Sequence, residues 1–342
     1  MTLLGKLHSL FSGRSVEPTK ADPSLSQLVQ AQRGLAEIQI RDGFLEVKGL
    51  SFFGQAHSSP SGRWVLGCAD NDGQGTGGYR ESGNGRVLLV DMVAGRIAHH
   101  IQNIARPWEA AVADTGTYVV NDVGFGSALS GDVLVFNQAG ERLYERQFAA
   151  NVFSVGISHC GRFIAVQTCN APTGSDGNLL EVHDVQEGVC LSSASPQTAW
   201  SLKYAFEVDD GNLKRLWVHD DRLGRFAYSS SGVFLDHRKY LDAALTKGDT
   251  GTRILAAESL LDAPEGSSDI ETALRVVSEA AEGAKESEQS WVPKALRLRG
   301  EALESLGRTS EAMAAYEAAL AGDPKIGVKR RLAALQRRQT KP

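Results

Sequence analysis

The sequence predicts a two-part chain, with a β-rich region over residues 35–236 followed by an α-helical region over residues 237–342. In the first part, short runs of valine, isoleucine, phenylalanine and tyrosine alternate with polar residues and end at glycines, as β-strands do. In the second part, alanine, leucine and glutamate dominate and the strand alternation stops, which is typical of helices. A chain of 342 residues is long enough for two domains with their own cores.

The overall composition excludes several classes of protein. Hydrophobic residues make up 42% and charged residues 23%, which excludes a wholly disordered chain and a small disulfide scaffold. No apolar run approaches the ~18 residues of a membrane span, so we expect no integral membrane association. The net charge of −5 argues against nucleic acid covering the whole surface, although a local basic patch could still bind it.

The first 34 residues are predicted to form an amphipathic helix and a linker. Apolar residues in Met1–Gly13 have the spacing of one helical face: Leu3, Leu4, Leu7, Leu10 and Phe11. Residues 14–30 are rich in serine and proline and lack periodicity, as in a linker. The helix is expected to bury its stripe on the protein's own core, in a partner's groove or at a membrane surface.

The β-rich region repeats with a period of about 46 residues. A glycine opens a strand in each unit, at Gly85, Gly131, Gly177 and Gly224. A second hairpin precedes each of these strands, so that a unit holds four strands. That period and that strand count predict the blades of a β-propeller.

The third unit resembles a WD repeat. Residues 152–165, followed by residues 180–184, match the family's strand, turn and "WD" strand end, with His183 where the family has tryptophan. The resemblance implies a WD-like propeller domain over residues 35–236 with about 4–5 blades: four units and a preceding hairpin. Either the hairpin helps to close the ring, or the array is incomplete and the C-terminal half covers its edge.

Six helices are predicted in the second part, over residues 237–247, 252–262, 268–283, 291–306, 309–322 and 326–338. Residues 293–324 resemble a tetratricopeptide repeat at Leu296, Arg299, Gly300, Leu303, Ala312, Tyr316 and Pro324. The resemblance implies helical hairpins that form a groove for a partner. A fainter earlier unit includes Ala273, Val277 and Ala280.

Aromatic residues recur near the start of the innermost strand of each unit, at Phe53, Trp108, Phe153 and Trp200. One interpretation is packing between blades, because large aromatic side chains dominate cores. The other is a ring of partner-binding contacts on one face of the propeller.

A glycine-rich loop offers a weak metal motif. The oxygen-bearing residues Asp70, Asp72, Gln74 and Glu81 have the spacing of a calcium-binding loop, with Gly75 at the sharp turn. The flanking segments are strands and not helices, so a glycine-rich insertion or a partner-binding loop is the competing interpretation.

The C-terminal segment, residues 325–342, carries seven basic residues and no acidic one: Lys325, Lys329, Arg330, Arg331, Arg337, Arg338 and Lys341. One interpretation is a solvated cap helix with Ile326, Leu332 and Leu335 facing inward. The alternatives are a site for nucleic acid and a site for an acidic surface, either of another protein or of the remainder of this chain.

No catalytic motif is recognisable. The sequence around Ser158 has the wrong spacing for a nucleophile elbow, and no Walker A motif is present. The four cysteines lack zinc spacing, and we expect them to be buried thiols of a cytoplasmic, bacterial protein. The predicted function is a non-catalytic scaffold or accessory subunit that binds a partner protein. The alternatives are a small-ligand- or metal-binding or enzymatic propeller, and nucleic-acid association through the basic tail.

Overall fold

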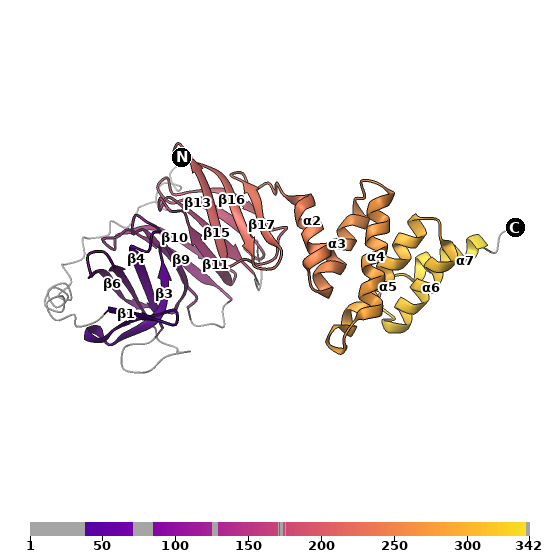
Figure 1. Cartoon of the computed structure of the whole chain (residues 1–342), viewed down its shortest axis with the longest axis horizontal. Coiled ribbons are helices and arrows are strands. Elements are labelled where there is room, and N and C mark those ends of the chain that lie inside the picture. Colours follow the sequence, from indigo (N-terminus) through magenta and orange to yellow (C-terminus); the bar gives the residue numbers. More distant parts are fainter. Residues whose placement is uncertain are drawn as a thin grey trace, which may run out of the picture.

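The computed structural model describes residues 38–70, 85–124, 129–169, 171, 174 and 176–339. A β region of four antiparallel sheets is followed by a row of helices (Figure 1). The predicted N-terminal helix and linker lie outside the described residues, as do Asp72, Gln74 and Glu81 of the predicted calcium loop. Within the described part of the chain, no helix has the length and apolar character needed to span a bilayer.

Each sheet is built from strands that follow one another in the chain. The first sheet contains β1 (Ile38–Arg41), β2 (Phe44–Val47), β3 (Phe52–Ser58), β4 (Trp64–Ala69), β5 (Gly85–Asp91) and β6 (Arg96–Ile104). The second contains β7 (Pro107–Val112), β8 (Tyr118–Asp122), β9 (Gly131–Phe136) and β10 (Arg142–Phe148). The third contains β11 (Val152–Ile157), β12 (Phe163–Thr168), β13 (Leu180–Asp184) and β14 (Val189–Ala194). The fourth contains β15 (Lys203–Asp209), β16 (Asn212–Asp220) and β17 (Gly224–Ser229).

The sheets pack face to face in chain order, as propeller blades do. Alternate residues of one strand enter opposite cores, because side chains of a strand alternate between the faces of its sheet. In β8, Tyr118 and Val120 pack toward the first sheet, and Val119 packs toward the third. In β12, Val166 packs toward the second sheet, and Phe163 toward the fourth. The middle sheets are therefore buried on both faces.

The two ends of the array differ. The hairpin of β1 and β2 pairs with β3, and its Leu45 and Val47 pack with Val90 in a separate core of the first sheet. This hairpin does not pair with the fourth sheet, so the predicted closure of the propeller ring by the hairpin is not seen. The fourth sheet has three strands instead of the predicted four, because the chain leaves β17 for a helix.

A turn is repeated in the first and third sheets. Arg63 Nη2 lies 3.0 Å from Asp91 Oδ2, and Arg162 Nη2 lies 2.6 Å from Asp184 Oδ2. In the third sheet the hydroxyl of Ser158 also accepts from the amide of Phe163 at 2.9 Å. Each arginine follows a glycine with positive φ, which the tight turn requires. The predicted repeat thus reflects a recurring hydrogen-bonded turn.

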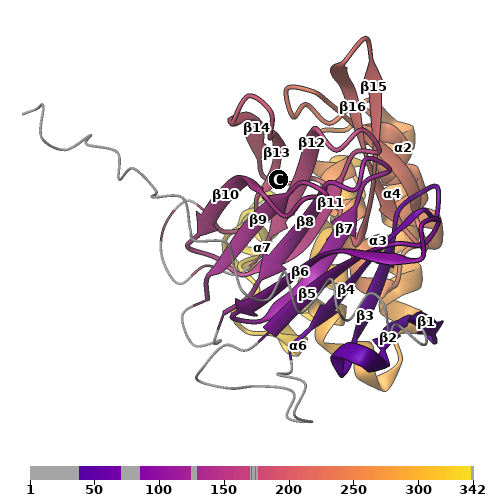
Figure 2. The same cartoon turned by 90° about the vertical axis from the view of Figure 1, so that its left-hand side faces the viewer.

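The helical part contains α2 (His237–Lys247), α3 (Thr250–Asp262), α4 (Ser267–Gly283), α5 (Val292–Ser305), α6 (Thr309–Gly322) and α7 (Lys329–Gln339). A 3-10 turn, η2 (Glu286–Trp291), precedes α5, and another, η1 (Lys48–Leu50), lies between β2 and β3. All six predicted helices are present, with ends shifted by at most three residues. Leu223 and Phe226 at the fourth sheet share a core with α2 to α5. Seen from the β end, the helices lie behind the sheets (Figure 2).

Helices α5 and α6 pack closely where the sequence predicts a helical hairpin. Gly300 lies against the ring of Tyr316, where a side chain would clash with Cε1. Leu303 and Tyr316 are buried together with Leu332 and Leu335 of α7, as predicted. These contacts bury one face of α7, and the tetratricopeptide assignment itself stays a prediction.

Candidate functional site

The recurring aromatic residues occupy equivalent places in the sheets. Phe53, Trp108 and Phe153 are the second residues of β3, β7 and β11, and Trp200 lies three residues before β15. Phe53 is 54% exposed, Trp108 51% and Trp200 52%. At about half exposure these three side chains are not part of the cores between the sheets, although Trp200 packs on Phe153 of the third sheet. Phe153 is half-buried, and its ring lies 5.2 Å from that of Trp200.

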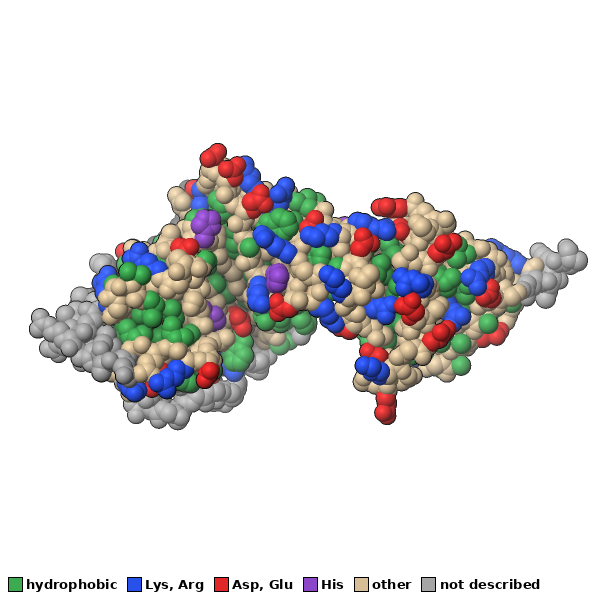
Figure 3. Space-filling model, in the orientation of Figure 1, with side chains coloured by type: hydrophobic (Ala, Val, Ile, Leu, Met, Phe, Trp, Pro, Cys, Tyr) green, Lys and Arg blue, Asp and Glu red, His purple; other side chains and the backbone are tan. Residues whose placement is uncertain are grey.

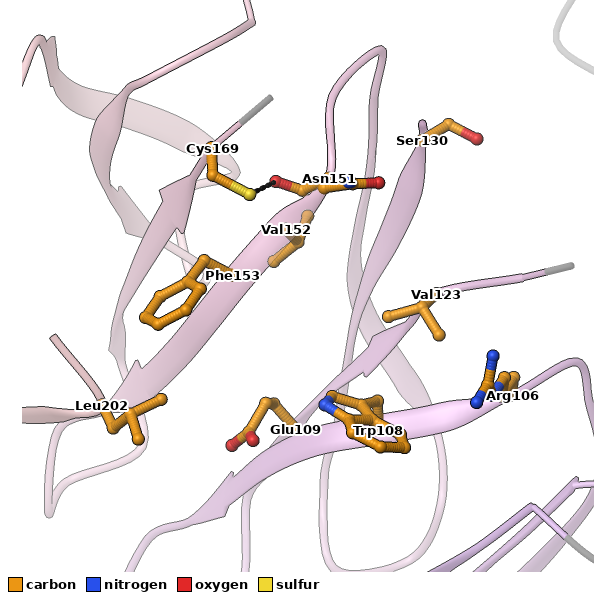
Figure 4. A pocket seen from close by; sticks show the side chains of 10 residues that line it. All are labelled: Arg106, Trp108, Glu109, Val123, Ser130, Asn151, Val152, Phe153, Cys169 and Leu202. Carbon is orange, nitrogen blue, oxygen red and sulfur yellow. Dashed lines mark hydrogen bonds between the residues drawn. The ribbon is translucent and has the colours of Figure 1, made fainter. Parts of the chain in front are cut away.

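A pocket of about 430 Å³ opens where the second, third and fourth sheets begin. Its lining includes Arg106, Trp108, Glu109, Val152, Phe153 and Leu202. Figure 4 shows the indole of Trp108 between the side chains of Arg106 and Glu109, with Phe153 across the hollow from Trp108. The structure therefore brings two of the four predicted aromatic residues into one pocket.

Two irregularities of strand pairing shape this pocket. In β7, Pro107 pairs with Asp122 and Ala110 with Val120, so Trp108 and Glu109 together face one partner residue. In β11, the register also shifts, and Phe153 has no partner in β12. Such bulges re-aim side chains that would otherwise alternate between faces. They explain why neighbouring residues Trp108 and Glu109 line the same pocket.

Hydrogen bonds hold the segments that carry the pocket residues. The carboxylate of Asp122 accepts from the backbone amides of Ala105 and Arg106 at 3.0 and 2.7 Å. The amide of Ser201 donates to Gln167 Oε1 at 3.0 Å, which fixes the chain next to Leu202. The pocket walls are thus attached to rigid sheets and are suited to bind a ligand without a large rearrangement.

The two charged residues of the pocket lining, Arg106 and Glu109, have different surroundings. The guanidinium of Arg106 lies over the Trp108 ring at 5.3 Å and has Asp70, the first residue of the predicted calcium loop, 3.8 Å from its Nε. Glu109 is half-buried, and burial raises the pKa of its carboxyl group. Among the described residues, no hydrogen bond or ion pair joins Glu109 to a partner. Sequence reasoning missed Glu109, because only the bulge directs it into the pocket.

The first sheet has a different arrangement at the equivalent place. Phe53 stacks on Phe44 of β2, with ring centroids 4.9 Å apart and an angle of 6° between the planes. Here a strand of the chain itself covers the inner edge of the sheet. The inner strands β7 and β11 are edge strands of their sheets.

A second polar cluster lies between β10 of the second sheet and β13 of the third. His183 Nε2 donates to Glu181 Oε2 at 3.0 Å, because a carboxylate can only accept. The Tyr144 hydroxyl lies 2.9 Å from His183 Nδ1, and Arg146 Nη2 donates to Glu181 Oε1 at 3.1 Å. Burial alone would raise the pKa of Glu181, but hydrogen bonds from His183 and Ser193 and the charge of Arg146 outweigh it and lower that pKa.

The same cluster contains a set of metal-ligand types. Donor atoms of Glu181, His183 and Cys190 lie within 4.8 Å of one another. However, the carboxylate and the imidazole are already hydrogen-bonded, and the Arg146 guanidinium beside Glu181 repels a cation. The chemistry of this set therefore favours a structural network. The pairing of β13 with β14 brings Cys190 to His183, so spacing in the sequence does not show this set.

The remaining predicted residues are dispersed. Arg331 lies 3.6 Å from Glu301 and 3.4 Å from the Tyr316 hydroxyl, so it holds α7 to α5 and α6. The other basic residues of the predicted tail that the structure describes are exposed: Lys325 lies before α7, and Lys329, Arg330, Arg337 and Arg338 lie on α7. The expectation of four buried thiols is wrong: Cys68 is buried, Cys169 is half-buried, and Cys160 and Cys190 are exposed.

Comparisons with known proteins do not show a family for this chain. No protein-family model matches it, and no curated protein matches it. A solved structure titled "Kuenenia stuttgartiensis Hydrazine Synthase" matches with 17% identity and a TM-score of 0.34, covering 53% of this chain and 47% of that one. The "Neurospora crassa Pan2 WD40 domain" matches with 11% identity and a TM-score of 0.33, covering 57% and 61%. This chain thus spans less than two thirds of either, and the class assignment rests on its own sheets: a propeller-like β region followed by helices.

Proposed function

We propose that this chain is a non-catalytic scaffold that binds a partner protein at the pocket between the inner strands. One observation carries the proposal: large aromatic side chains recur at the same place in successive sheets, and those of the first, second and fourth are exposed. Exposed tryptophan in a rigid, partly dehydrated pocket is the usual composition of a protein-binding hot spot. Folding alone does not require it, because the cores between the sheets are filled by other residues.

The helical part would add a second surface. We infer that α4 to α6 form tetratricopeptide-like hairpins, supported by the close approach of Gly300 and Tyr316 and by the buried Ala273 and Val277. Their exposed faces carry intermixed acidic and basic side chains (Figure 3). Hydrophobic side chains gather on the β region in the same view. We infer that the pocket is the better candidate for the primary contact, because Trp108 is exposed in it. A cytoplasmic location stays a prediction.

The test is capture of partners from native lysate by tagged full-length protein, with and without nuclease, followed by mass spectrometry. The double variant Trp108→Ala/Trp200→Ala should lose a stoichiometric protein partner that the wild type captures. The matched double variant Val93→Ala/Leu143→Ala, which alters exposed apolar residues elsewhere, should retain it.

Other outcomes would overturn the proposal. A partner that both double variants retain would place the binding surface elsewhere, on the helices or on α7. A partner that is lost with nuclease would favour nucleic-acid association. Deletion of residues 325–342 should then abolish binding and its salt dependence.

A further inference from the structure

The half-buried carboxylate of Glu109 identifies what the pocket can bind. It lines the pocket together with aromatic and apolar side chains and with Arg106, Ser130 and Asn151, and the residues that the structure describes provide it with no hydrogen bond or ion pair. A partly dehydrated carboxylate without a partner is unfavourable unless a ligand supplies the opposite charge. Glu181, one sheet further on, shows the usual solution, because Arg146 and His183 both contact it.

The walls of the pocket suit the same kind of ligand. Trp108 and Phe153 stand on opposite sides, and aromatic ring faces attract cations. The chain already uses Trp108 in this way, since Arg106 lies over its ring. Figure 4 shows Arg106 on the side of the indole away from Glu109, and the ion pair of Arg106 is with Asp70. Leu202 and Val152 would pack against the methylene groups of a long side chain.

We propose that the pocket binds an arginine or lysine side chain of the partner protein, with Glu109 as its counter-ion and the rings of Trp108 and Phe153 as its walls. This inference rests on the proposed function and specifies the ligand of the same site. A volume of about 430 Å³ accommodates one long side chain together with a neighbouring residue. A phosphate or carboxylate ligand would be repelled by Glu109, while Arg106 is already paired with Asp70. A neutral ligand would supply Glu109 with no counter-ion.

The test uses bead-displayed heptapeptide pools with a fixed central residue and six randomised positions. The central residue is arginine, lysine, the neutral arginine analogue citrulline, leucine or glutamate. Tagged full-length protein is bound, and its fluorescence on the beads is measured. The arginine or lysine pool should bind at least about fivefold more wild-type protein than the citrulline and leucine pools, as expected of a charge-assisted contact.

Variants separate the role of Glu109 from general effects of charge. With Glu109→Gln, the arginine and lysine pools should bind about as much protein as the citrulline and leucine pools. Glu109→Asp keeps the charge on a shorter side chain and should retain part of the preference for the cationic pools. Glu145→Gln removes an exposed carboxylate from β10 of the same sheet and should leave the preference unchanged. Thermal unfolding of each variant confirms that it is folded.

Two outcomes distinguish this inference from the proposed function. If the protein binds the peptide pools equally whatever their central residue, and Trp108→Ala abolishes that binding, the proposed binding surface is supported and the cation inference is overturned. If no pool exceeds the glutamate pool, the cation inference is also overturned. The proposed function then depends on the lysate experiment alone.

Discussion

The interface between the second and third sheets contains two acidic residues in contrasting surroundings. At its buried part, Glu181 contacts Arg146, His183 and Ser193, and its pKa is lowered. At its open end, Glu109 faces an aromatic pocket without a described partner, and its pKa is raised. The same pair of sheets therefore holds one carboxylate with several partners from the chain and one without a described partner.

The contrast separates structural from functional polar groups. A buried charge that serves the fold is surrounded by donors from the chain itself. A dehydrated charge without such donors in a cleft is a candidate for a functional site. The bulges in β7 and β11 strengthen this interpretation, because they aim Glu109 and Phe153 at the open end.

Removal of the Glu181 charge should have the largest effect on stability. Glu181→Gln leaves Arg146 without its buried counter-ion, and Arg146 is 35% exposed, so we expect a loss of about 2–3 kcal/mol. Urea unfolding followed by tryptophan fluorescence measures it. Glu187→Gln, an exposed carboxylate of the same sheet, is the control and should change little. Equal losses in the two variants would show that the network does not stabilise the fold.

Acid should remove the contribution of Glu181. Because the folded pKa of this carboxyl group is lowered, its contribution is present above the ordinary value of 4.5 and is lost as the pH falls through the folded pKa. The difference in unfolding free energy between wild type and Glu181→Gln should therefore shrink below about pH 4.5. Urea midpoints measured between pH 7 and pH 3 test this. A difference that is constant with pH would contradict it.

The stability of the hairpin that covers the inner edge of the first sheet should depend on the stacking of Phe44 on Phe53. Phe44→Ala removes the ring that lies on Phe53, and we expect a loss of about 1 kcal/mol. Urea unfolding measures the loss, and Leu143→Ala, another partly exposed apolar residue, is the control. If Phe44→Ala costs no more than this control, the hairpin is not held by the aromatic pair.

Neutralising Glu109 should have the smallest effect, with the opposite sign. Burial raises the pKa of this carboxyl group, so its contribution to stability is largest at acid pH and falls as the pH rises from 4.5 through the folded pKa. Glu109→Gln should therefore stabilise the protein at pH 7 by less than about 1 kcal/mol, because solvent screens a half-exposed group. Thermal unfolding at pH 7 and pH 4 should show a larger gain at pH 7. Destabilisation at pH 7 would indicate a structural partner for Glu109.

Much of the architecture could be predicted because it depends on local patterns. Helix α2 begins and ends at the predicted residues, and Leu332 and Leu335 are buried as their spacing indicates. The repeat of glycine turns gave the order of the strands in the first three units. The fourth unit was predicted less well, because its missing strand depends on the packing of α2 against β17 and not on its own turns.

The sequence by itself determined the two-part fold, the repeat and the positions of Phe53, Trp108, Phe153 and Trp200, because periodicity and turn residues act over a few neighbours. Only the tertiary structure decided which of these aromatic residues share a pocket and which acidic residue joins them. It also placed Tyr144 beside His183, 39 residues away along the chain. The physical reason is that strand register, bulges and sheet packing depend on contacts between distant segments, and these decide whether a carboxylate such as Glu109 or Glu181 finds a partner.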